Sequence, residues 1–135
     1  MKTTVVIINW NGEKYIDNLL SYFEVNYEAE PCEVLIVDNK STDTSLGLIS
    51  NHNCKLLSLN YNWGFAIGNN IGGAVVETEN ILFMNNDMLP KGGFVKAMED
   101  KCTSRYPIVG AKLIFGETKE IAIDNICLKT DEGKL

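Results

Sequence analysis

Residues 4–12 read TVVIINWNG, and this stretch decides the fold class. Its first five residues are all β-branched, which is typical of a parallel strand buried on both faces. Asn9, Trp10, Asn11 and Gly12 end the run, and we expect Asn11 to cap the helix that follows. The apolar positions of that helix recur at helical spacing, at Ile16, Leu19, Leu20 and Phe23.

The same alternation of strand and helix continues outward from this stretch. Buried strands are predicted at 33–37, 54–59 and 80–84. The helical segments between them carry apolar residues at Leu46, Leu48 and Ile49 and at Ile67, Ile71 and Val75. Strands and helices at this spacing form right-handed βαβ units. We therefore expect the α/β class, as a Rossmann-like three-layer α/β/α sandwich with a mostly parallel sheet.

The last third of the chain carries a weaker pattern. Pro90 suits the first turn of another helix, whose predicted face comprises Phe94, Ala97, Met98 and Cys102. Residues 108–115 predict one further strand, kinked at Gly110, and 117–135 is interpreted as a poorly defined tail. A length of 135 residues fits a single domain, 1–135.

The composition excludes several classes of protein. No apolar run approaches the roughly 18 residues of a membrane span. The apolar stretch near the N-terminus, Val5–Ile8, is too short for a signal peptide, so we expect a cytoplasmic protein. A net charge of −6 argues against a nucleic-acid partner, which needs a basic surface.

The cysteine and histidine residues predict no further chemistry. The cysteines form no CxxC pair, and they lie far apart at Cys32, Cys54, Cys102 and Cys127. Zinc and redox functions therefore find no support, and we interpret these residues as buried or incidental thiols in a reducing compartment. His52, between two asparagines, is interpreted as a surface residue.

Small, polar and acidic residues follow the predicted strands. They are Asn9, Trp10 and Asn11 after the first strand, Asp38, Asn39, Ser41 and Asp43 after the second, and Asn85, Asn86 and Asp87 after the fourth. In a parallel sheet the ligand binds beyond the carboxyl ends of the strands, so these residues predict a site. One such loop would fit turn and cap chemistry alone, and Ser41, Thr42 and Asp43 are cap candidates for the next helix. Three such loops in this order favour a binding site.

Four segments resemble the donor-site blocks of family 2 glycosyltransferases. They are IINWNG (7–12), VDNKSTD (37–43), NWGFAIGNNIG (62–72) and FMNNDM (83–88). The resemblance covers residues 3–116 in the order and spacing of the family and is nearest to its rhamnosyltransferase-like subgroup. It implies the GT-A fold, truncated, with the acceptor half absent. It also implies polysaccharide or cell wall biosynthesis as the setting.

The resemblance assigns roles at the nucleotide. Asn9, Trp10 and Asn11 fall where the end of the first strand packs on the base, although Trp10 is equally well explained as a partly buried packing residue. Asp38 matches the acidic residue that accepts a hydrogen bond from the ring N–H of a pyrimidine, which implies a UDP- or dTDP-sugar donor. Asn39 and Ser41 belong to the same block.

The resemblance also assigns roles at the diphosphate. Asn85-Asn86-Asp87 falls at the DxD motif of the family, which implies Mn²⁺ or Mg²⁺ held by Asp87 with Asn85. Gly64, Gly68 and Asn69 fall in the block near the phosphates, where the family often has a basic residue and this chain has Asn69. Gly68 and Gly72 are also explained as close-packing glycines of a helix face.

The implied function is inverting transfer of a sugar from a nucleotide-diphosphate donor to a glycan or lipid-linked acceptor. Such a reaction needs a general base, and no later carboxylate forms a recognisable copy of the family's motif for it. The alternatives are a fragment of a longer transferase, which we favour, or a non-catalytic nucleotide-sugar-binding module. The sequence leaves open self-association and peripheral attachment to a membrane. An oxidoreductase is disfavoured because GxGxxG is missing after the first strand, whereas a nucleotidyltransferase is harder to exclude.

Overall fold

The computed structural model describes residues 2–111, 113–114, 121–123 and 127–128. The chain divides into two compact units, Met1–Gly93 and Phe94–Leu135, and each is described by itself. The expectation of a single domain stays a prediction. Among the described residues, no helix combines the length and apolarity that crossing a membrane requires.

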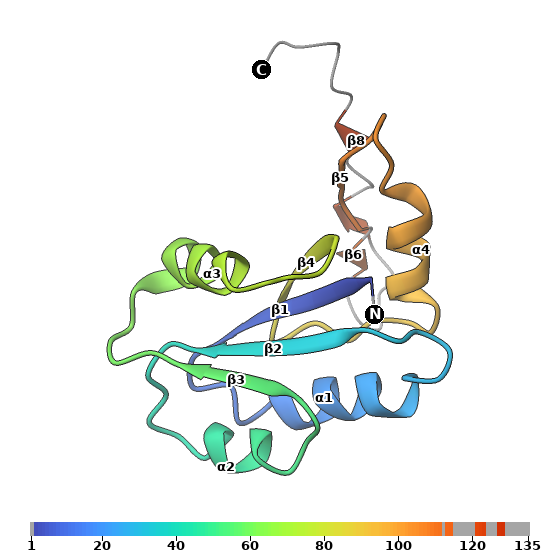
Figure 1. The fold of residues 1–135 in the computed structure, drawn as a ribbon. Helices are drawn as coiled ribbons and strands as arrows, with labels where there is room; N and C mark the ends of the chain where they lie inside the picture. Colours follow the sequence, from blue (N-terminus) through green and yellow to red (C-terminus); the bar gives the residue numbers. More distant parts are fainter. Residues whose placement is uncertain (1, 112, 115–120, 124–126, 129–135) are drawn as a thin grey trace. The chain divides into compact units, whose positions relative to one another are not determined.

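The first unit is built on a four-stranded sheet in the order β3-β2-β1-β4 (Figure 1). Its strands are β1 (Thr3–Asn9), β2 (Glu33–Asp38), β3 (Lys55–Ser58) and β4 (Asn80–Asn85). Every pair of neighbouring strands is parallel. The predicted strands are therefore confirmed, and Asn9, Asp38 and Asn85 are each the last residue of a strand.

Helices cover both faces of this sheet. In Figure 1, α3 (Gly64–Ala74) lies on one face, and α1 (Ile16–Val25) and α2 (Ser45–Ile49) lie on the other. The expected three-layer α/β/α arrangement is confirmed. The four predicted apolar positions of α1 are all buried, as the helical spacing requires. On the sheet, Val5, Val6, Ile7, Ile36 and Val37 have no exposed surface.

The α3 helix packs on the sheet through small residues. Its buried residues are Gly68, Asn69 and Gly72, whereas Ile67 is 47% exposed. A Cβ atom at Gly72 would lie 2.6 Å from Val6 Cγ1 and 2.8 Å from Val37 Cγ2. The β-branched side chains of the sheet therefore need a glycine opposite them. The close-packing interpretation of Gly68 and Gly72 is confirmed.

The second unit contains one helix and four short strands. The helix is α4 (Phe94–Lys101), and the strands are β5 (Ile108–Val109), β6 (Leu113–Ile114), β7 (Ile121–Ile123) and β8 (Cys127–Leu128). Two antiparallel pairs form, β5 with β8 and β6 with β7.

Three expectations for this part of the chain need correction. Pro90 precedes α4 by four residues and is not in its first turn. The single strand expected at 108–115 is two strands, β5 and β6, that belong to different sheets, because each pairs with a different later segment. The expected tail contains β7 and β8, and its remaining residues, 117–120, 124–126 and 129–135, lie outside the described residues.

Candidate functional site

The sheet brings the predicted site residues together at its carboxyl edge. The parallel register places Asn9 beside Asp38 on β2 and Ile8 beside Asn85 on β4. The chain runs from β1 outward to β3 and then crosses back to β4 on the other side of β1. Such a reversal of strand order leaves a crevice at the ends of the two strands, where α/β proteins bind ligands. The topology therefore places a candidate site between the ends of β1 and β4.

A pocket of about 420 Å³ lies at this point. It is lined by the ends of β1 and β4, the first turn of α3 and the loops beside them: Ile8, Trp10, Asn39, Asn62, Gly64, Phe65, Asn85, Asn86 and Asp87. Six residues predicted from the sequence are among these: Trp10, Asn39, Gly64, Asn85, Asn86 and Asp87. The other predicted residues, Asn9, Asn11, Asp38, Ser41, Gly68 and Asn69, do not line it.

Asp38 is buried behind the pocket and organises the loop that follows β2. Asp38 is only 1% exposed. Oδ1 accepts hydrogen bonds from Asn9 Nδ2 at 2.9 Å and Ser41 Oγ at 2.6 Å, and Oδ2 accepts one from the Ser41 N–H at 3.0 Å. A buried carboxylate is stable when hydrogen bonds satisfy its oxygens, as they do here. In this structure Asp38 therefore acts within the loop, and its contact with a base stays a prediction.

A hydrogen-bonded clasp joins the loop after β1 to the loop after β2. Asn11 adopts a positive φ of 51°, which turns its Oδ1 to accept the Thr42 N–H at 2.8 Å. Its own N–H donates to Ser41 Oγ at 2.9 Å. The prediction that Asn11 caps α1 was wrong, because the N-cap residue is Tyr15 and makes no side-chain cap bond. Asn11 instead holds two site loops together.

A second clasp lies further along the same loops. Glu13 Oε2 accepts hydrogen bonds from Thr44 N–H and Oγ1, and Asp43 accepts the N–H groups of Glu13 and Ser45. Burial opposes ionisation of Asp43, but the hydrogen bonds from Ser45 and Glu13 outweigh it and lower the pKa of this carboxyl. The cap candidate Asp43 therefore serves the start of α2 and also ties α2 to the first loop.

Asn39 and Asn69 position the entrance to α3. Asn39 Oδ1 accepts the Trp63 N–H at 3.1 Å, and its Nδ2 donates to the Gly64 carbonyl at 3.0 Å. Gly64 has a φ of +79°, a conformation that favours glycine. Asn69 Nδ2 donates to the Phe65 carbonyl, while its Oδ1 is buried without a partner among the described residues. Asn39 thus fixes one wall of the pocket, and Asn69 lies in the helix behind it.

Two aromatic rings stand at the pocket with much of their surface exposed. Trp10 is 56% exposed and Phe65 is 59% exposed. This degree of exposure disfavours the packing interpretation of Trp10 and leaves its ring available to a flat ligand. Phe65, Asn62 and Ile8 also line the pocket but were not among the predicted site residues. Their place in the sequence could have identified them, because Phe65 and Asn62 lie within two residues of Gly64 and Ile8 directly precedes Asn9.

The donor set at Asp87 is suited to a shared cation. Asp87, Asn85 and Asn86 offer one carboxylate and two amide oxygens at the pocket. Within the described part of the chain, no three histidine, cysteine or acidic residues cluster so as to hold a metal ion. Mg²⁺ is commonly held by one or two carboxylates together with substrate phosphates. The residues therefore fit a divalent cation that a diphosphate helps to bind, and they do not form a complete cage.

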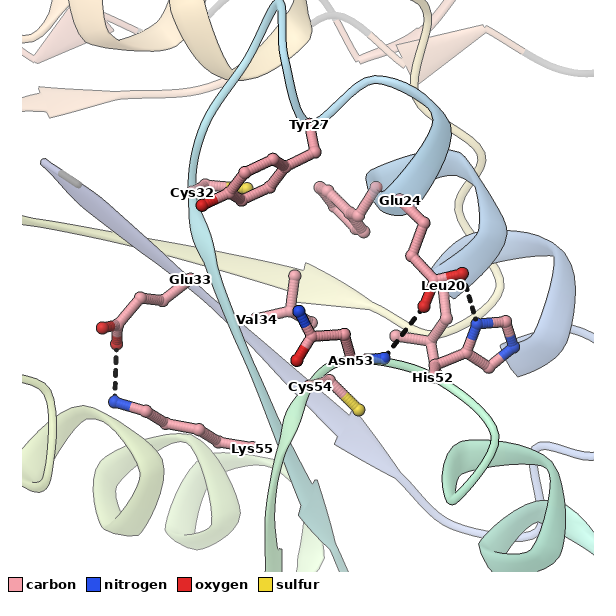
Figure 2. A pocket seen from close by; sticks show the side chains of 11 residues that line it. Leu20, Glu24, Tyr27, Cys32, Glu33, Val34, His52, Asn53, Cys54 and Lys55 are labelled. Atoms are coloured by element: carbon pink, nitrogen blue, oxygen red, sulfur yellow. Dashed lines mark hydrogen bonds and ion pairs between the residues drawn. The ribbon is translucent and has the colours of Figure 1, made fainter.

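A second cavity, of about 480 Å³, lies at the amino ends of β2 and β3 (Figure 2). Lys55 Nζ pairs with Glu33 Oε2 at 2.9 Å, and Glu24 accepts the Asn53 N–H at 2.9 Å. Figure 2 shows the two pairs that these groups form, Lys55 with Glu33 and Glu24 with His52. This cavity contains none of the predicted site residues and lies at the edge of the sheet opposite to the carboxyl ends.

His52 lines this second cavity and is not the surface residue expected. Its side chain is 9% exposed and lies between two carboxylates of α1, with Nε2 3.0 Å from Asp17 Oδ1 and Nδ1 3.1 Å from Glu24 Oε2. Burial opposes protonation of the ring, but the two carboxylates outweigh it and raise the pKa of His52. Asp17 and Glu24 are seven residues apart in α1 and therefore lie on the same face of the helix. The asparagines that flank His52 in the sequence gave no sign of this contact.

The fold and the pocket define a Rossmann-like α/β domain with a candidate ligand site at the switch point of its sheet. The family described as "Glycosyl transferase family 2" matches residues 4–125, and the chain therefore belongs to this family. No curated protein sequence matches the chain significantly. The rhamnosyltransferase-like subgroup stays a prediction.

Solved structures of similar fold include TarS, PcManGT and a glucosyl-3-phosphoglycerate synthase. Staphylococcus aureus TarS is 28% identical, over 76% of this chain and 19% of that chain, with a TM-score of 0.66. Mannosyltransferase PcManGT from Pyrobaculum calidifontis, in complex with GDP-Man and Mn²⁺, is 13% identical over 84% of this chain and 35% of that chain, with a TM-score of 0.67.

Glucosyl-3-phosphoglycerate synthase from Mycobacterium tuberculosis is the third. Its complex with Mn²⁺, UDP and glucosyl-3-phosphoglycerate is 16% identical over 76% of this chain and 40% of that chain, with a TM-score of 0.65. At these identities, the two structures under 25% show the fold alone. This chain spans at most 40% of the length of the three proteins.

Proposed function

We propose that this chain is the donor-binding part of a glycosyltransferase that uses a UDP- or dTDP-sugar. The observation that carries the proposal is the pocket at the ends of β1 and β4, where an exposed aromatic ring and the Asn85-Asp87 turn line one space. Membership of glycosyl transferase family 2 supports transfer of a sugar from a nucleotide as the chemistry. The acceptor we propose is a glycan or a lipid-linked saccharide, and the transfer is inverting.

Each wall of the pocket has a part in binding. Trp10 offers its ring face to the base, and Asn39 and Gly64 form a further part of the pocket lining. Asp38 accepts the ring N–H of the base when Ser41 releases one carboxylate oxygen. Asp87, with Asn85, would hold Mn²⁺ or Mg²⁺, and the cation would neutralise the charge that develops on the departing diphosphate.

The structures of similar fold are consistent with a nucleotide-sugar ligand. The TarS 1–349 structure contains UDP-GlcNAc, and the synthase structure contains UDP and Mn²⁺. PcManGT was solved with GDP-Man, so the same fold accommodates a purine nucleotide as well. For this chain, the preference for a pyrimidine rests on Asp38 alone. It is therefore a separate question from nucleotide binding.

Calorimetric titration of the full chain with UDP, dTDP and GDP tests the proposal. We expect UDP and dTDP to bind more tightly than GDP and the affinity for UDP to rise when Mn²⁺ is added. A chain that binds none of the three nucleotides in the presence of Mn²⁺ would not be a nucleotide-sugar-binding protein, and the proposal would be wrong.

Substitution of Asp87 tests the cation. Asp87→Ala should bind UDP equally with and without Mn²⁺, because the one carboxylate at the turn is gone. Glu77→Ala is a matched control, since Glu77 is an exposed carboxylate before the amino end of β4, and it should behave as the wild type. A Mn²⁺ effect that persists in Asp87→Ala would remove Asp87 from the cation site.

A second candidate function is a non-catalytic nucleotide-sugar-binding module. It is favoured by the lack of a recognisable general base in the sequence. Both functions predict binding of the donor, but only the enzyme predicts turnover. Incubation with a UDP-sugar and a candidate acceptor distinguishes them, because release of UDP requires transfer or hydrolysis. Cytoplasmic location and self-association stay predictions.

A further inference from the structure

Asn9 connects the loop after β2 to the turn after β4. It is the last residue of β1 and has no exposed surface. Its Nδ2 donates to Asp38 Oδ1 at 2.9 Å and lies 3.0 Å from Ser45 Oγ. Its Oδ1 accepts a hydrogen bond from Asn86 Nδ2 at 3.2 Å. One buried carboxamide therefore contacts both the loop after β2 and the turn after β4.

The orientation of this carboxamide is determined by its partners. Ser41 Oγ donates its hydrogen to Asp38 and Ser45 Oγ donates its hydrogen to Asp43, so both hydroxyl oxygens act as acceptors toward Asn9. An amide has two donor hydrogens on nitrogen and none on oxygen. Rotating the Asn9 amide by 180° would place its oxygen against a carboxylate and two hydroxyl acceptors. Asn9 Oδ1 therefore faces Asn86.

The orientation of Asn86 follows from that of Asn9. Asn86 uses Nδ2 to reach Asn9, so its Oδ1 is the side-chain atom left for the pocket that Asn86 lines. An amide oxygen next to the Asp87 carboxylate suits a hard divalent cation. The same amide turned over would present N–H groups, which repel a cation.

We propose that Asn9 is a positioning residue that sets the Asn86 carbonyl oxygen toward the cation and couples the cation side of the pocket to the Asp38–Ser41 loop. This inference rests on the proposed function and goes beyond it in two respects. It adds Asn86 to the cation site, and it predicts that events at the turn are felt at the loop that would meet the base. Coupling of this kind is reciprocal between two binding events.

Gly12 provides a way to separate Asn9 from Asn86 without removing either side chain. A Cβ atom at Gly12 would overlap both Asn9 Oδ1 and Asn86 Nδ2. Gly12 lines neither cavity, so Gly12→Ala displaces the contact between Asn9 and Asn86 but removes no pocket side chain. Gly47→Ala is the matched control, because nothing lies within 4 Å of a Cβ atom at Gly47.

The experiment is an NMR titration of the full chain with Mg²⁺ and inorganic pyrophosphate, which completes a cation site but carries no base. In the wild type and in Gly47→Ala, we expect shifts in the turn at Asn85–Asp87, in the Asn9 side-chain amide and in the Ser41 backbone amide. In Gly12→Ala, we expect the shifts to be confined to the turn. A role of Gly12 in folding alone would not confine them.

Asn86→Ala serves as the second variant should Gly12→Ala fail to fold, and it should also lose the shift at Ser41. Shifts at Ser41 that are equal in the wild type and in the folded variant would overturn the inference, as would their absence from the wild type. UDP binding measured on the same samples separates the two proposals. A wild type that binds UDP but shows no shift at Ser41 retains the proposed function and loses only the coupling.

Discussion

At the scale of single residues, Asp38 has two roles to consider: the hydrogen bonds that it makes in this structure and the predicted hydrogen bond to a base. Its carboxylate accepts three hydrogen bonds from protein groups, which hold the loop after β2. A carboxylate can accept about four hydrogen bonds, so little capacity is left for a base unless the loop rearranges. Asp38 is therefore both a loop anchor and the residue predicted to recognise the pyrimidine.

We expect Asp38→Ala to weaken UDP binding more than pyrophosphate binding, by about 1–3 kcal/mol, because a charged hydrogen bond to the base is lost. Calorimetry with both ligands measures this difference. Asp43→Ala is the control, because Asp43 also accepts hydrogen bonds from backbone N–H groups of these loops but is not predicted to contact the base. Equal losses for UDP and pyrophosphate would limit Asp38 to holding the loop.

Trp10 is a second residue whose role can be measured directly. Its ring is 56% exposed at the pocket, so its fluorescence should respond to a stacked base. We expect UDP to change the emission attributable to Trp10 and pyrophosphate to leave it unchanged. Trp63 also contributes fluorescence, and Trp63→Phe removes this background while keeping a ring beside Tyr61. An identical response to both ligands would place the base elsewhere.

At the scale of elements, the packing of α3 on the sheet depends on glycine. We expect Gly72→Ala to lower the free energy of unfolding by about 1–3 kcal/mol, because the new methyl group would overlap Val6 and Val37. Chemical denaturation measures this change. Gly47→Ala, in the open space around α2, should be neutral or stabilising by up to about 1 kcal/mol. A stabilised Gly72→Ala variant would show that the helix can move off the sheet at little cost.

The positions of α1 and the loop before β3 are linked through His52. Its raised pKa means that the folded state binds a proton more tightly than the unfolded state. The contribution to stability is therefore fully present below the ordinary pKa of about 6.5, and it is lost as the pH rises through the raised value. Glu24 and Glu33 have lowered pKa values, so their contributions to stability change only at acidic pH. They do not change in the pH range in which His52 loses its proton.

We expect the wild type to lose stability relative to His52→Gln as the pH rises from about 6.5 through the raised pKa of His52. Denaturation curves of both proteins at several pH values measure the difference. The variant keeps a polar side chain of similar reach but cannot be protonated. Parallel pH profiles for the two proteins would contradict a charged His52 in the folded state.

At the scale of the whole molecule, the strand order determines where a ligand can bind. The chain proceeds from β1 to β3 on one side and returns to β4 on the other, so the ends of β1 and β4 lie next to each other with no connection between them. The 420 Å³ pocket lies there, whereas the 480 Å³ cavity at the amino ends of β2 and β3 holds paired charges. Volume alone would have selected the cavity that contains none of the predicted site residues.

The sequence by itself determined the parallel sheet, the succession of strands and helices along the chain, and the edge of the sheet that carries the candidate site. Uninterrupted β-branched runs and helical periodicity are local properties, and the polar residues that end each run are adjacent to it in the chain. The rule that ligands bind beyond the carboxyl ends of parallel strands then placed Asn9, Asp38 and Asp87 on one edge.

Only the tertiary structure decided which of those side chains face the pocket and which face inward. The direction of Asn9 is set by Asp38, 29 residues away, and by Asn86, 77 residues away. The burial of His52 depends on a helix 35 residues earlier, and the glycine face of α3 depends on the shape of the sheet beneath it. These contacts join segments that are distant in sequence, so no local pattern encodes them.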